Sequence, residues 1–190
     1  MTDPHPEVDA ALPRGSAMAS EPLAVVHFDG ACQPPAGGGI AAYGFTVTGA
    51  GIAHEESGLA VRPGSPASTN NVAEYTAAIR ALEWLLARGY EGPVVLHGDS
   101  QLVVRQMRGE YRVRAPHLLA YHERLAQLAG RFRSVTFVWV PRSHNTRADA
   151  LSKLAIAREI RLPTAGEDTA TPGSDPKSDR AAGAQSHRTV

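Results

Sequence analysis

The architecture of the chain can be worked out from the segment Asn70-Asn-Val-Ala-Glu-Tyr-Thr-Ala-Ala-Ile-Arg-Ala-Leu-Glu-Trp-Leu-Leu-Ala-Arg-Gly89. From Tyr75 to Leu86 its apolar side chains recur at intervals of three and four residues, which predicts an amphipathic helix. Asn70 or Asn71 is expected to cap the start of this helix, and Gly89 to end it. A helix in this place can carry the chain across a sheet, so that later strands pair in parallel with earlier ones.

Three strands are predicted before this helix. The first covers residues 23–28 and is bounded by Gly30 and a Pro-Pro turn, the second runs from about 40 to 48, and the third from 52 to 60. The segment Gly49-Ala50-Gly51 forms the turn between the last two. Because the connections are short, we expect an antiparallel meander.

Strands and helices alternate after the long helix. A buried strand is predicted at 93–97, helices at about 100–107 and 116–129, a strand at 135–140 and a final helix at about 146–160. The order βββαβααβα predicts one α/β domain. Its sheet is expected to be mixed and five-stranded, a three-strand antiparallel meander plus two parallel strands, with helices on both faces. Trp84 and Trp139 are expected to pack in the core.

Composition separates the ends of the 190-residue chain from its centre. Residues 1–21 and 163–190 are rich in Ala, Pro, Gly, Ser, Thr and Asp and have no apolar periodicity, which predicts disordered tails around a folded domain at 22–162. Residues 23–162 hold 15 basic and 11 acidic side chains, a net charge of +4, and almost all the basic ones are arginine. This excess suits a polyanionic partner.

Cysteine content and hydropathy bear on location. Cys32 is the only cysteine, so an intrachain disulfide is excluded, which fits a reducing compartment. No stretch approaches 18 consecutive apolar residues, and the acidic N-terminus lacks the features of a secretory signal. We therefore expect a cytoplasmic protein with no membrane partner.

Four acidic residues stand where strands end or helices begin, and each has an ordinary explanation. Asp29 interrupts an apolar strand but could start a turn. Glu74 and Asp149 lie near helix starts, where the helix dipole favours acids. Asp99 follows a strand and precedes a helix, which either Asp99 or Ser100 could cap.

Together the four acids indicate a shared metal site, which none of them indicates alone. Ligands gather at strand ends in α/β sheets, so these carboxylates could converge on one point. Their mutual repulsion would be relieved by hard divalent cations, of which Mg²⁺ is the usual occupant beside phosphate. Two such ions can activate a water and stabilise a leaving oxygen, so convergence would favour phosphodiester hydrolysis.

Four segments that contain these acids resemble the signature blocks of the type I ribonuclease H family. They are Phe28-Asp-Gly-Ala-Cys32, Asn70-Asn-Val-Ala-Glu-Tyr75, Gly98-Asp-Ser-Gln-Leu102 and His144-Asn-Thr-Arg-Ala-Asp149. They follow the family's order with similar spacing, and the likeness covers about residues 23–160. The resemblance implies an endoribonuclease that cleaves the RNA strand of RNA/DNA hybrids by a two-metal mechanism, leaving 5′-phosphate and 3′-hydroxyl ends. It also implies the ligands of two Mg²⁺ ions, or Mn²⁺: Asp29, Glu74, Asp99 and Asp149.

The resemblance extends to substrate contacts. It implies that RNA 2′-hydroxyls, which distinguish RNA from DNA, are recognised in the minor groove by Gly30, Cys32, Asn70, Asn71 and Gln101, with Asn145 as a further substrate contact. Helix capping explains the two adjacent asparagines equally well, and Cys32 could be a small buried hydrophobe. His144 resembles the family's loop histidine, which assists water activation or product release, although its loop is shorter than in many relatives.

One departure from the family concerns the basic protrusion that many bacterial relatives carry before the third helix. The segment from Arg108 to Pro116 is too short for it. A patch of four arginines could contact the substrate backbone in its place, or form only a solvated basic edge: Arg105, Arg108, Arg112 and Arg114. The expected partner is an RNA/DNA hybrid, with double-stranded RNA as a further candidate, and the protein is expected to be a monomer.

Two other functions are considered. The segment Gly98-Asp-Ser-Gln-Leu102 superficially resembles the Gly-Asp-Ser-Leu esterases, with Ser100 as nucleophile, but it lies mid-chain and His144 precedes Asp149, which is not that family's order. An inactive nucleic-acid-binding module of the same fold is the second alternative. Such a descendant would be expected to lose at least one of the four acids, and all four are present.

Overall fold

The secondary structure follows the predicted order. A computed structural model describes residues 22–34 and 38–162. Its elements are β1 (Ala24–Gln33), β2 (Ile40–Gly49), β3 (Ile52–Leu59), α1 (Asn70–Ala87), β4 (Pro93–Gly98), α2 (Gln101–Met107), α3 (Pro116–Ala129), β5 (Ser134–Trp139), the short 3₁₀ helix η1 (Arg142–His144) and α4 (Thr146–Arg161). The segments predicted as disordered tails, 1–21 and 163–190, lie outside the described residues.

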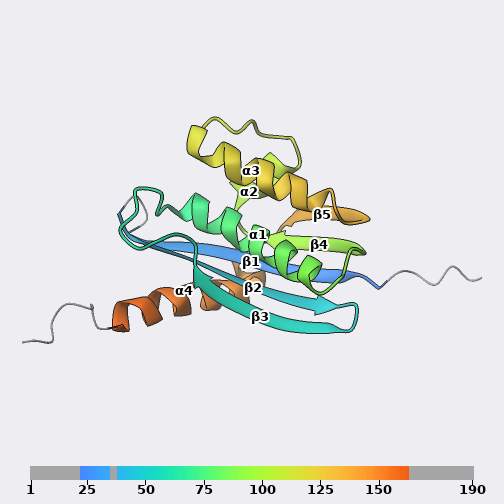
Figure 1. The fold of residues 1–190 in the computed structure, drawn as a ribbon, viewed down its shortest axis with the longest axis horizontal. Coiled ribbons are helices and arrows are strands. Elements are labelled where there is room, and N and C mark those ends of the chain that lie inside the picture. The colour runs from blue at the N-terminus through green and yellow to red at the C-terminus, as the bar shows by residue number, and fades with distance from the viewer. Residues whose placement is uncertain (1–21, 35–37, 163–190) are drawn as a thin grey trace, which may run out of the picture.

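The five strands form one sheet in the order β3-β2-β1-β4-β5. The first three pair antiparallel, β4 runs parallel to β1, and β5 runs parallel to β4. Helices α1, α2 and α3 cover one face and α4 covers the other (Figure 1). The predicted mixed sheet with helices on both faces is therefore confirmed.

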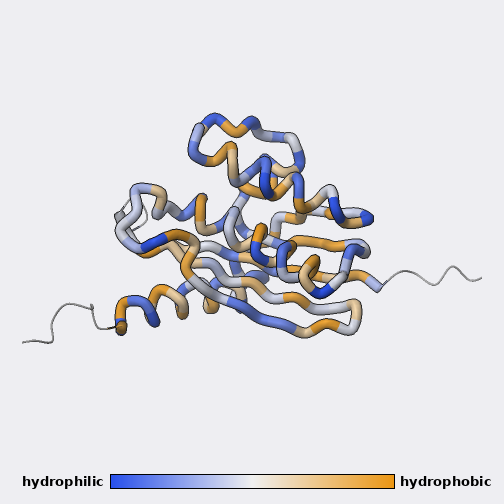
Figure 2. The backbone as a smooth tube through the Cα atoms, viewed as in Figure 1, coloured by the Kyte–Doolittle hydropathy of each residue, from blue (hydrophilic) through white to orange (hydrophobic). Residues whose placement is uncertain are grey.

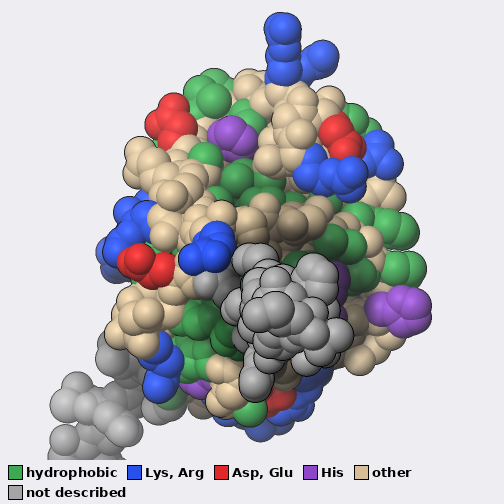
Figure 3. Space-filling view, turned by 90° about the vertical axis from the view of Figure 1, so that its right-hand side faces the viewer, with side chains coloured by type: hydrophobic (Ala, Val, Ile, Leu, Met, Phe, Trp, Pro, Cys, Tyr) green, Lys and Arg blue, Asp and Glu red, His purple; other side chains and the backbone are tan. Residues whose placement is uncertain are grey.

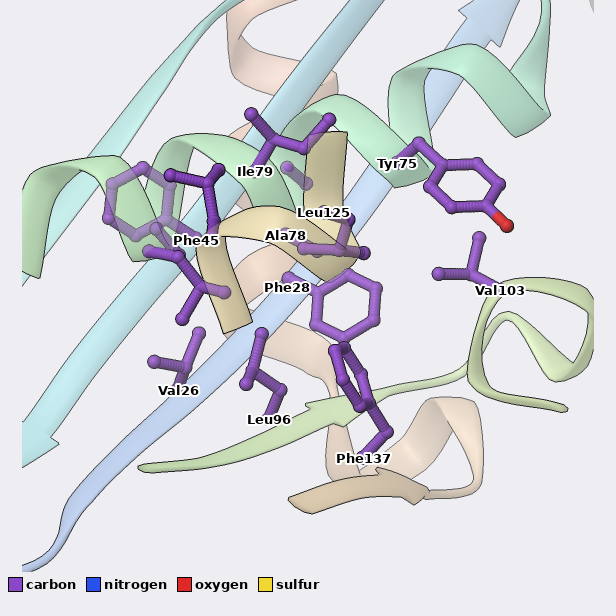
Figure 4. Close-up of a cluster of buried hydrophobic side chains, with 14 of the residues drawn as sticks. Val26, Phe28, Phe45, Tyr75, Ala78, Ile79, Leu96, Val103, Leu125 and Phe137 are labelled. Carbon is purple, nitrogen blue, oxygen red and sulfur yellow. The ribbon is translucent and has the colours of Figure 1, made fainter. Parts of the chain in front are cut away.

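The main core lies between the sheet and α1. Phe28 and Phe45 of the sheet and Leu82 of the helix are fully buried there, and Figure 4 shows Phe28 close to Phe137 beneath α1. Strand β4 is hydrophobic over most of its length (Figure 2), as expected for an inner strand with neighbours on both sides. A smaller cluster, which includes Ile156, packs α4 against the opposite face.

Three local predictions were wrong. The first strand does not end before Gly30, because its pairing with β2 continues to Gln33 opposite Ile40. Helix α1 is capped by Thr69, whose hydroxyl accepts a hydrogen bond of 3.2 Å from the amide of Val72, rather than by an asparagine. Trp139 is not in the core: it ends the outermost strand and is 42% exposed.

The surface offers two broader observations. At the end of the molecule seen in Figure 3, basic side chains stand apart from one another among acidic and hydrophobic ones, rather than gathering in one patch. Among the described residues, none of the helices combines the length and the apolar character that crossing a membrane would need.

Trp84 is partly buried against the main core, with its ring stacked on His54.

Candidate active site

The pairing of β1 with β4 brings two carboxylates together. Their parallel ladder ends with Phe28 opposite Gly98, and the next residue on each strand is an acid, Asp29 and Asp99. Glu74 joins them from α1. One carboxylate oxygen from each of these three residues lies within 4.8 Å of the others. The three line a pocket of about 300 Å³, so the predicted convergence holds for three of the four acids.

Two glycines allow helices to reach this point from opposite faces of the sheet. A Cβ built on Gly30 would stand 2.1 Å from the backbone nitrogen of Glu74 in α1. A Cβ built on Gly44, which is paired with Asp29, would stand 2.5 Å from the backbone nitrogen of Ser152 in α4. Either side chain would push its helix away. The glycines therefore set how closely Glu74 and Ser152 approach Asp29.

Two of the three carboxylates, those of Asp29 and Glu74, are held in an environment that opposes their charge. Burial, together with the charges of Asp99 and Asp149, raises the pKa of Asp29 from 3.8 to about 7, against the hydrogen bond from Ser152, which lowers it. Burial and the neighbouring acids also raise the pKa of Glu74 well above its ordinary value. Its Oε2 is buried and has no hydrogen-bond partner among the described residues. A buried acid cluster with an unpartnered oxygen fits hard divalent cations.

Asp99 is free to serve this site because Ser100 caps the helix that follows. The Ser100 hydroxyl accepts a hydrogen bond of 3.4 Å from the amide of Val103. Asn145 Nδ2 donates to Asp99 Oδ1 at 3.1 Å and to the carbonyl of Phe28 at 2.8 Å. The indole N–H of Trp139 donates to the backbone carbonyl of Asp99 at 3.1 Å. Asp99 is thus held through both its side chain and its backbone.

Asp149 lies beside the three-acid group without being part of it. Its Oδ1 accepts a hydrogen bond from Arg142, and Lys153 Nζ lies 2.7 Å from its Oδ2. Burial would raise the pKa of Asp149, but the hydrogen bonds from Lys153 and Arg142 outweigh it and hold that pKa below its ordinary value. The fourth predicted metal ligand is therefore ion-paired in this structure, and its role as a ligand stays a prediction.

The predicted substrate-contacting residues occupy different surroundings. Gly30, Cys32 and Asn70 line the pocket, and the Cys32 thiol donates to the carbonyls of Pro34 and Ser68 at 3.0 and 3.1 Å. Asn71, within the first turn of α1, is half-buried, and Gln101, the first residue of α2, is exposed. Asn145 is only 1% exposed and donates both of its amide hydrogen bonds inside the protein.

The pocket also contains basic residues that the sequence analysis missed. Arg142 and Lys153 line it together with the acids, whereas the side chain of His144, in the same 3₁₀ helix as Arg142, is exposed. Ser152, which donates to Asp29 Oδ2 at 2.6 Å, was missed as well. The sequence held one sign of them: Ser152 and Lys153 follow Asp149 by three and four residues, the spacing of neighbours on a helix face.

The four predicted arginines divide between two hollows on either side of the segment after α2. Arg105 and Arg108 line a cavity of about 650 Å³ between α2 and β5, which also includes Trp139. Arg112 and Arg114 line a second cavity of about 500 Å³. Arg108 Nε lies 2.9 Å from Glu110 Oε1. Glu110 lines both cavities, so the two hollows are adjacent, and the role of the four arginines as one substrate-binding patch stays a prediction.

The sequence and fold of this chain are similar to those of known proteins. A family model described as reverse transcriptase-like matches residues 49–155, more than half of the chain. The crystal structure of RNase H1 from the halophilic archaeon Halobacterium salinarum NRC-1 matches with a TM-score of 0.64 at 35% identity, covering 72% of this chain and 98% of that one. This chain belongs to the type I ribonuclease H family.

Two further proteins are similar to this ribonuclease H. The crystal structure of LC11-RNase H1 in complex with an RNA/DNA hybrid matches with a TM-score of 0.64 at 36% identity, covering 72% of this chain and 99% of that one. A bifunctional protein of Mycobacterium tuberculosis is 40% identical over 103 residues, which are 54% of this chain and 28% of that protein. This ribonuclease H thus spans little more than a quarter of the mycobacterial relative. Only residues 108–115 separate α2 from α3, so this ribonuclease H lacks the basic protrusion.

Proposed function

We propose that this ribonuclease H is an endonuclease that hydrolyses the RNA strand of RNA/DNA hybrids. The observation that carries the proposal is the group of Asp29, Glu74 and Asp99, of which the first two are buried and the third half-buried, with oxygens within 4.8 Å of one another. A protein gains nothing in stability from such a cluster, because the charges oppose one another and burial opposes those of Asp29 and Glu74. Divalent cations bound at this site would offset the repulsion between the carboxylates.

The donor set fits Mg²⁺, or Mn²⁺, because all of its ligands are carboxylate oxygens. Asp29, Glu74 and Asp99 would hold the metal, with Asp149 as a fourth ligand after it leaves its basic partners. Two divalent ions held by these carboxylates would supply the activation of a water and the stabilisation of the leaving 3′ oxygen, and the products would carry 5′-phosphate and 3′-hydroxyl ends.

The protein's own side chains orient this site. Ser152 fixes Asp29 through its hydrogen bond of 2.6 Å. Asn145 fixes Asp99 and ties it to β1. We assign Asn145 this positioning role in place of substrate contact, because it is buried and both amide hydrogen bonds are used within the protein. His144 stays a candidate for proton transfer at the exposed edge of the site.

Substrate binding is proposed at the mouth of the pocket. Gly30, Cys32, Asn70, Asn71 and Gln101 surround the acids or begin the adjacent helices, where they could contact 2′-hydroxyls in the minor groove of a hybrid. The arginines of the two hollows are proposed to contact backbone phosphates further from the scissile bond. Double-stranded RNA is a weaker candidate substrate, and we propose a monomer that acts in the cytoplasm.

The experiment compares labelled RNA/DNA, RNA/RNA and DNA/DNA duplexes with Mg²⁺, Mn²⁺ or EDTA, and maps the ends of the products. We expect cleavage of the RNA strand of the hybrid, with either metal and not with EDTA. Tight hybrid binding without cleavage would instead favour the binding module. A Ser100→Ala variant that lost esterase activity, in a protein inert on hybrids, would favour the esterase.

A further inference from the structure

Lys153 occupies an unusual place beside the proposed metal site. Its ammonium lies 2.7 Å from Asp149 Oδ2, while Arg142 takes Oδ1 of the same carboxylate. Both oxygens of Asp149 are therefore engaged by cations. The Asp149 side chain is 15% exposed and the Lys153 side chain 58% exposed, so the pair lies at the boundary between pocket and solvent.

Lys153 lines the pocket together with Asp29, Glu74 and Asp99. If Asp149 is to ligate a metal, one of its oxygens must leave a basic partner. The released ammonium would then stand in the pocket where the proposed function brings a substrate phosphate.

Position 153 carries a lysine, whereas the other basic residues of the domain are arginines. Residues 22–162 contain 15 basic side chains, and Lys153 is the only lysine among them. Arginine presents a rigid planar fork, which favours one fixed pairing with a carboxylate. The lysine ammonium is a compact charge on a flexible four-carbon stem, so it can change partners without a defined geometry. Lys153 extends from the second turn of α4, next to Ser152, whose backbone packs against Gly44. Its stem therefore starts from a fixed point.

We propose that Lys153 is an exchangeable counter-ion of the active site. It neutralises Asp149 before divalent ions bind, and it moves to a phosphate oxygen of the substrate once Asp149 coordinates metal. This inference rests on the proposed function and adds to it a residue that links metal loading to substrate binding.

The exchange predicts opposite effects on two affinities. In Lys153→Gln, no ammonium competes with the metal for Asp149, so Mg²⁺ should bind about two- to fivefold more tightly, the range of a partly exposed ion pair. The hybrid should bind more weakly, with KM raised about two- to fivefold, because a phosphate contact is lost. Lys153→Arg keeps the charge but favours a fixed pairing with Asp149, so it should bind Mg²⁺ less tightly than Lys153→Gln and recover only part of the substrate affinity. A purely structural ion pair would lower the melting temperature and leave Mg²⁺ affinity unchanged.

The direct test follows the lysine itself. Reductive ¹³C-methylation of the full chain labels Lys153, Lys177 and the N-terminal amine, and it preserves their charge. Lys177→Arg separates the two lysine signals. Titration with MgCl₂ in the absence of nucleic acid should shift the Lys153 signal alone. Calorimetric Mg²⁺ affinities are measured on wild type, Lys153→Gln and Arg158→Gln, which removes one exposed charge from the same helix and should leave the affinity unchanged.

The outcomes are distinguishable. Mg²⁺ binding that leaves the Lys153 signal unmoved, with the same affinity in Lys153→Gln, would overturn the exchange while leaving the metal site intact. Equal tightening in Lys153→Gln and Arg158→Gln would reduce the effect to overall charge and also overturn it. Wild-type protein that binds Mg²⁺ no better than Glu74→Gln would overturn the proposed function, and the exchange with it.

Discussion

The hydroxyl of Ser152 donates a hydrogen bond of 2.6 Å to Asp29 Oδ2, although the two residues are 123 positions apart. Ser152 is fully buried and Asp29 is 3% exposed. The bond joins α4 to β1 inside the carboxylate group. It also opposes the rise in the pKa of Asp29 that burial causes. Ser152 is therefore placed to keep Asp29 oriented and ionisable.

Replacing Ser152 by Ala should remove this support with little change in volume. Loss of an outer hydrogen-bond partner of a metal ligand commonly costs 10–100-fold in metal affinity or activity, and we expect about tenfold weaker Mg²⁺ binding and a lower kcat/KM. Mg²⁺ titrations and steady-state cleavage assays measure both. Ser134→Ala, an exposed serine at the start of β5, is the matched control. Equal behaviour of the two variants would remove Ser152 from the site.

Asp29→Asn should abolish hybrid cleavage while leaving the fold intact. Asp29 is one of the three acids whose oxygens lie within 4.8 Å of one another, so the loss of its charge disrupts the proposed metal binding. At pH 8 the metal-free variant should melt at a higher temperature than wild type, because one buried repulsive charge is gone. Circular dichroism and thermal melts in EDTA check the fold. Wild-type turnover by this variant would contradict the assignment of the metal site.

The stability of the metal-free protein should depend on pH in the direction opposite to that of a salt-bridged acid. The pKa of Asp29 in the folded protein is about 7, against an ordinary 3.8, so the folded state binds the proton more tightly. This contribution is present below about pH 4 and is lost as pH rises through 7. It has an upper bound of about 4 kcal/mol, at 1.36 kcal/mol for each pH unit.

Urea unfolding in EDTA between pH 4 and pH 8 measures this dependence, and comparison with Asp29→Asn isolates it from the other carboxylates. The free energy of unfolding should fall more steeply with pH in wild type than in the variant. Saturating Mg²⁺ should restore wild-type stability at pH 8, since a cation bound only to the folded state stabilises it. Parallel curves for the two proteins would show that Asp29 titrates normally.

The division of the arginines between two hollows makes the patch testable in halves. Arg105→Ala with Arg108→Ala, and Arg112→Ala with Arg114→Ala, should each raise KM more than they lower kcat if that pair contacts phosphates. The log–log salt slope of hybrid binding should become shallower by about 0.7–0.9 for each lost contact. The control is Arg131→Ala, because the side chain of Arg131 pairs with Glu91. A pair with an unchanged KM and slope is a solvated edge.

Deletion of residues 1–20 and 165–190 should preserve both stability and activity. Neither segment has the apolar periodicity needed to join a core. Melting temperature and kcat/KM of the shortened protein are compared with those of the full chain. A large fall in melting temperature would show that one of the segments packs on the domain. Loss of cleavage alone would show that one binds substrate.

Much of the architecture could be predicted because it depends on local patterns of apolar residues. The spacing from Tyr75 to Leu86 identified α1, and its place after three strands indicated the change from antiparallel to parallel pairing. Local patterns could not show that β1 continues past Gly30, because that continuation depends on pairing with β2. They also could not place Trp139, since apolar residues on an outermost strand can face solvent as readily as the core.

The candidate site was predictable in its acids and less so in their surroundings. The family's blocks named Asp29, Glu74 and Asp99, which the structure brings together. The contacts of Asp149 with Arg142 and Lys153 depend on how η1 meets α4, and a sequence pattern does not describe that junction. Thr69 was missed as the cap of α1 because two asparagines follow it, and residues one position apart are equally plausible caps.

The two glycines beside Asp29 have a consequence for how mutations spread through this protein. Gly30 and Gly44 let the backbones of α1 and α4 rest directly on β1 and β2, so main-chain contact sets the height of each helix above the sheet. A change in the size of a core side chain further along α1 can be accommodated by local repacking. A single methyl group at either glycine cannot be absorbed in this way, because it meets backbone atoms. The separation of the carboxylates is thus less sensitive to substitutions in the core than to a substitution at either of these glycines.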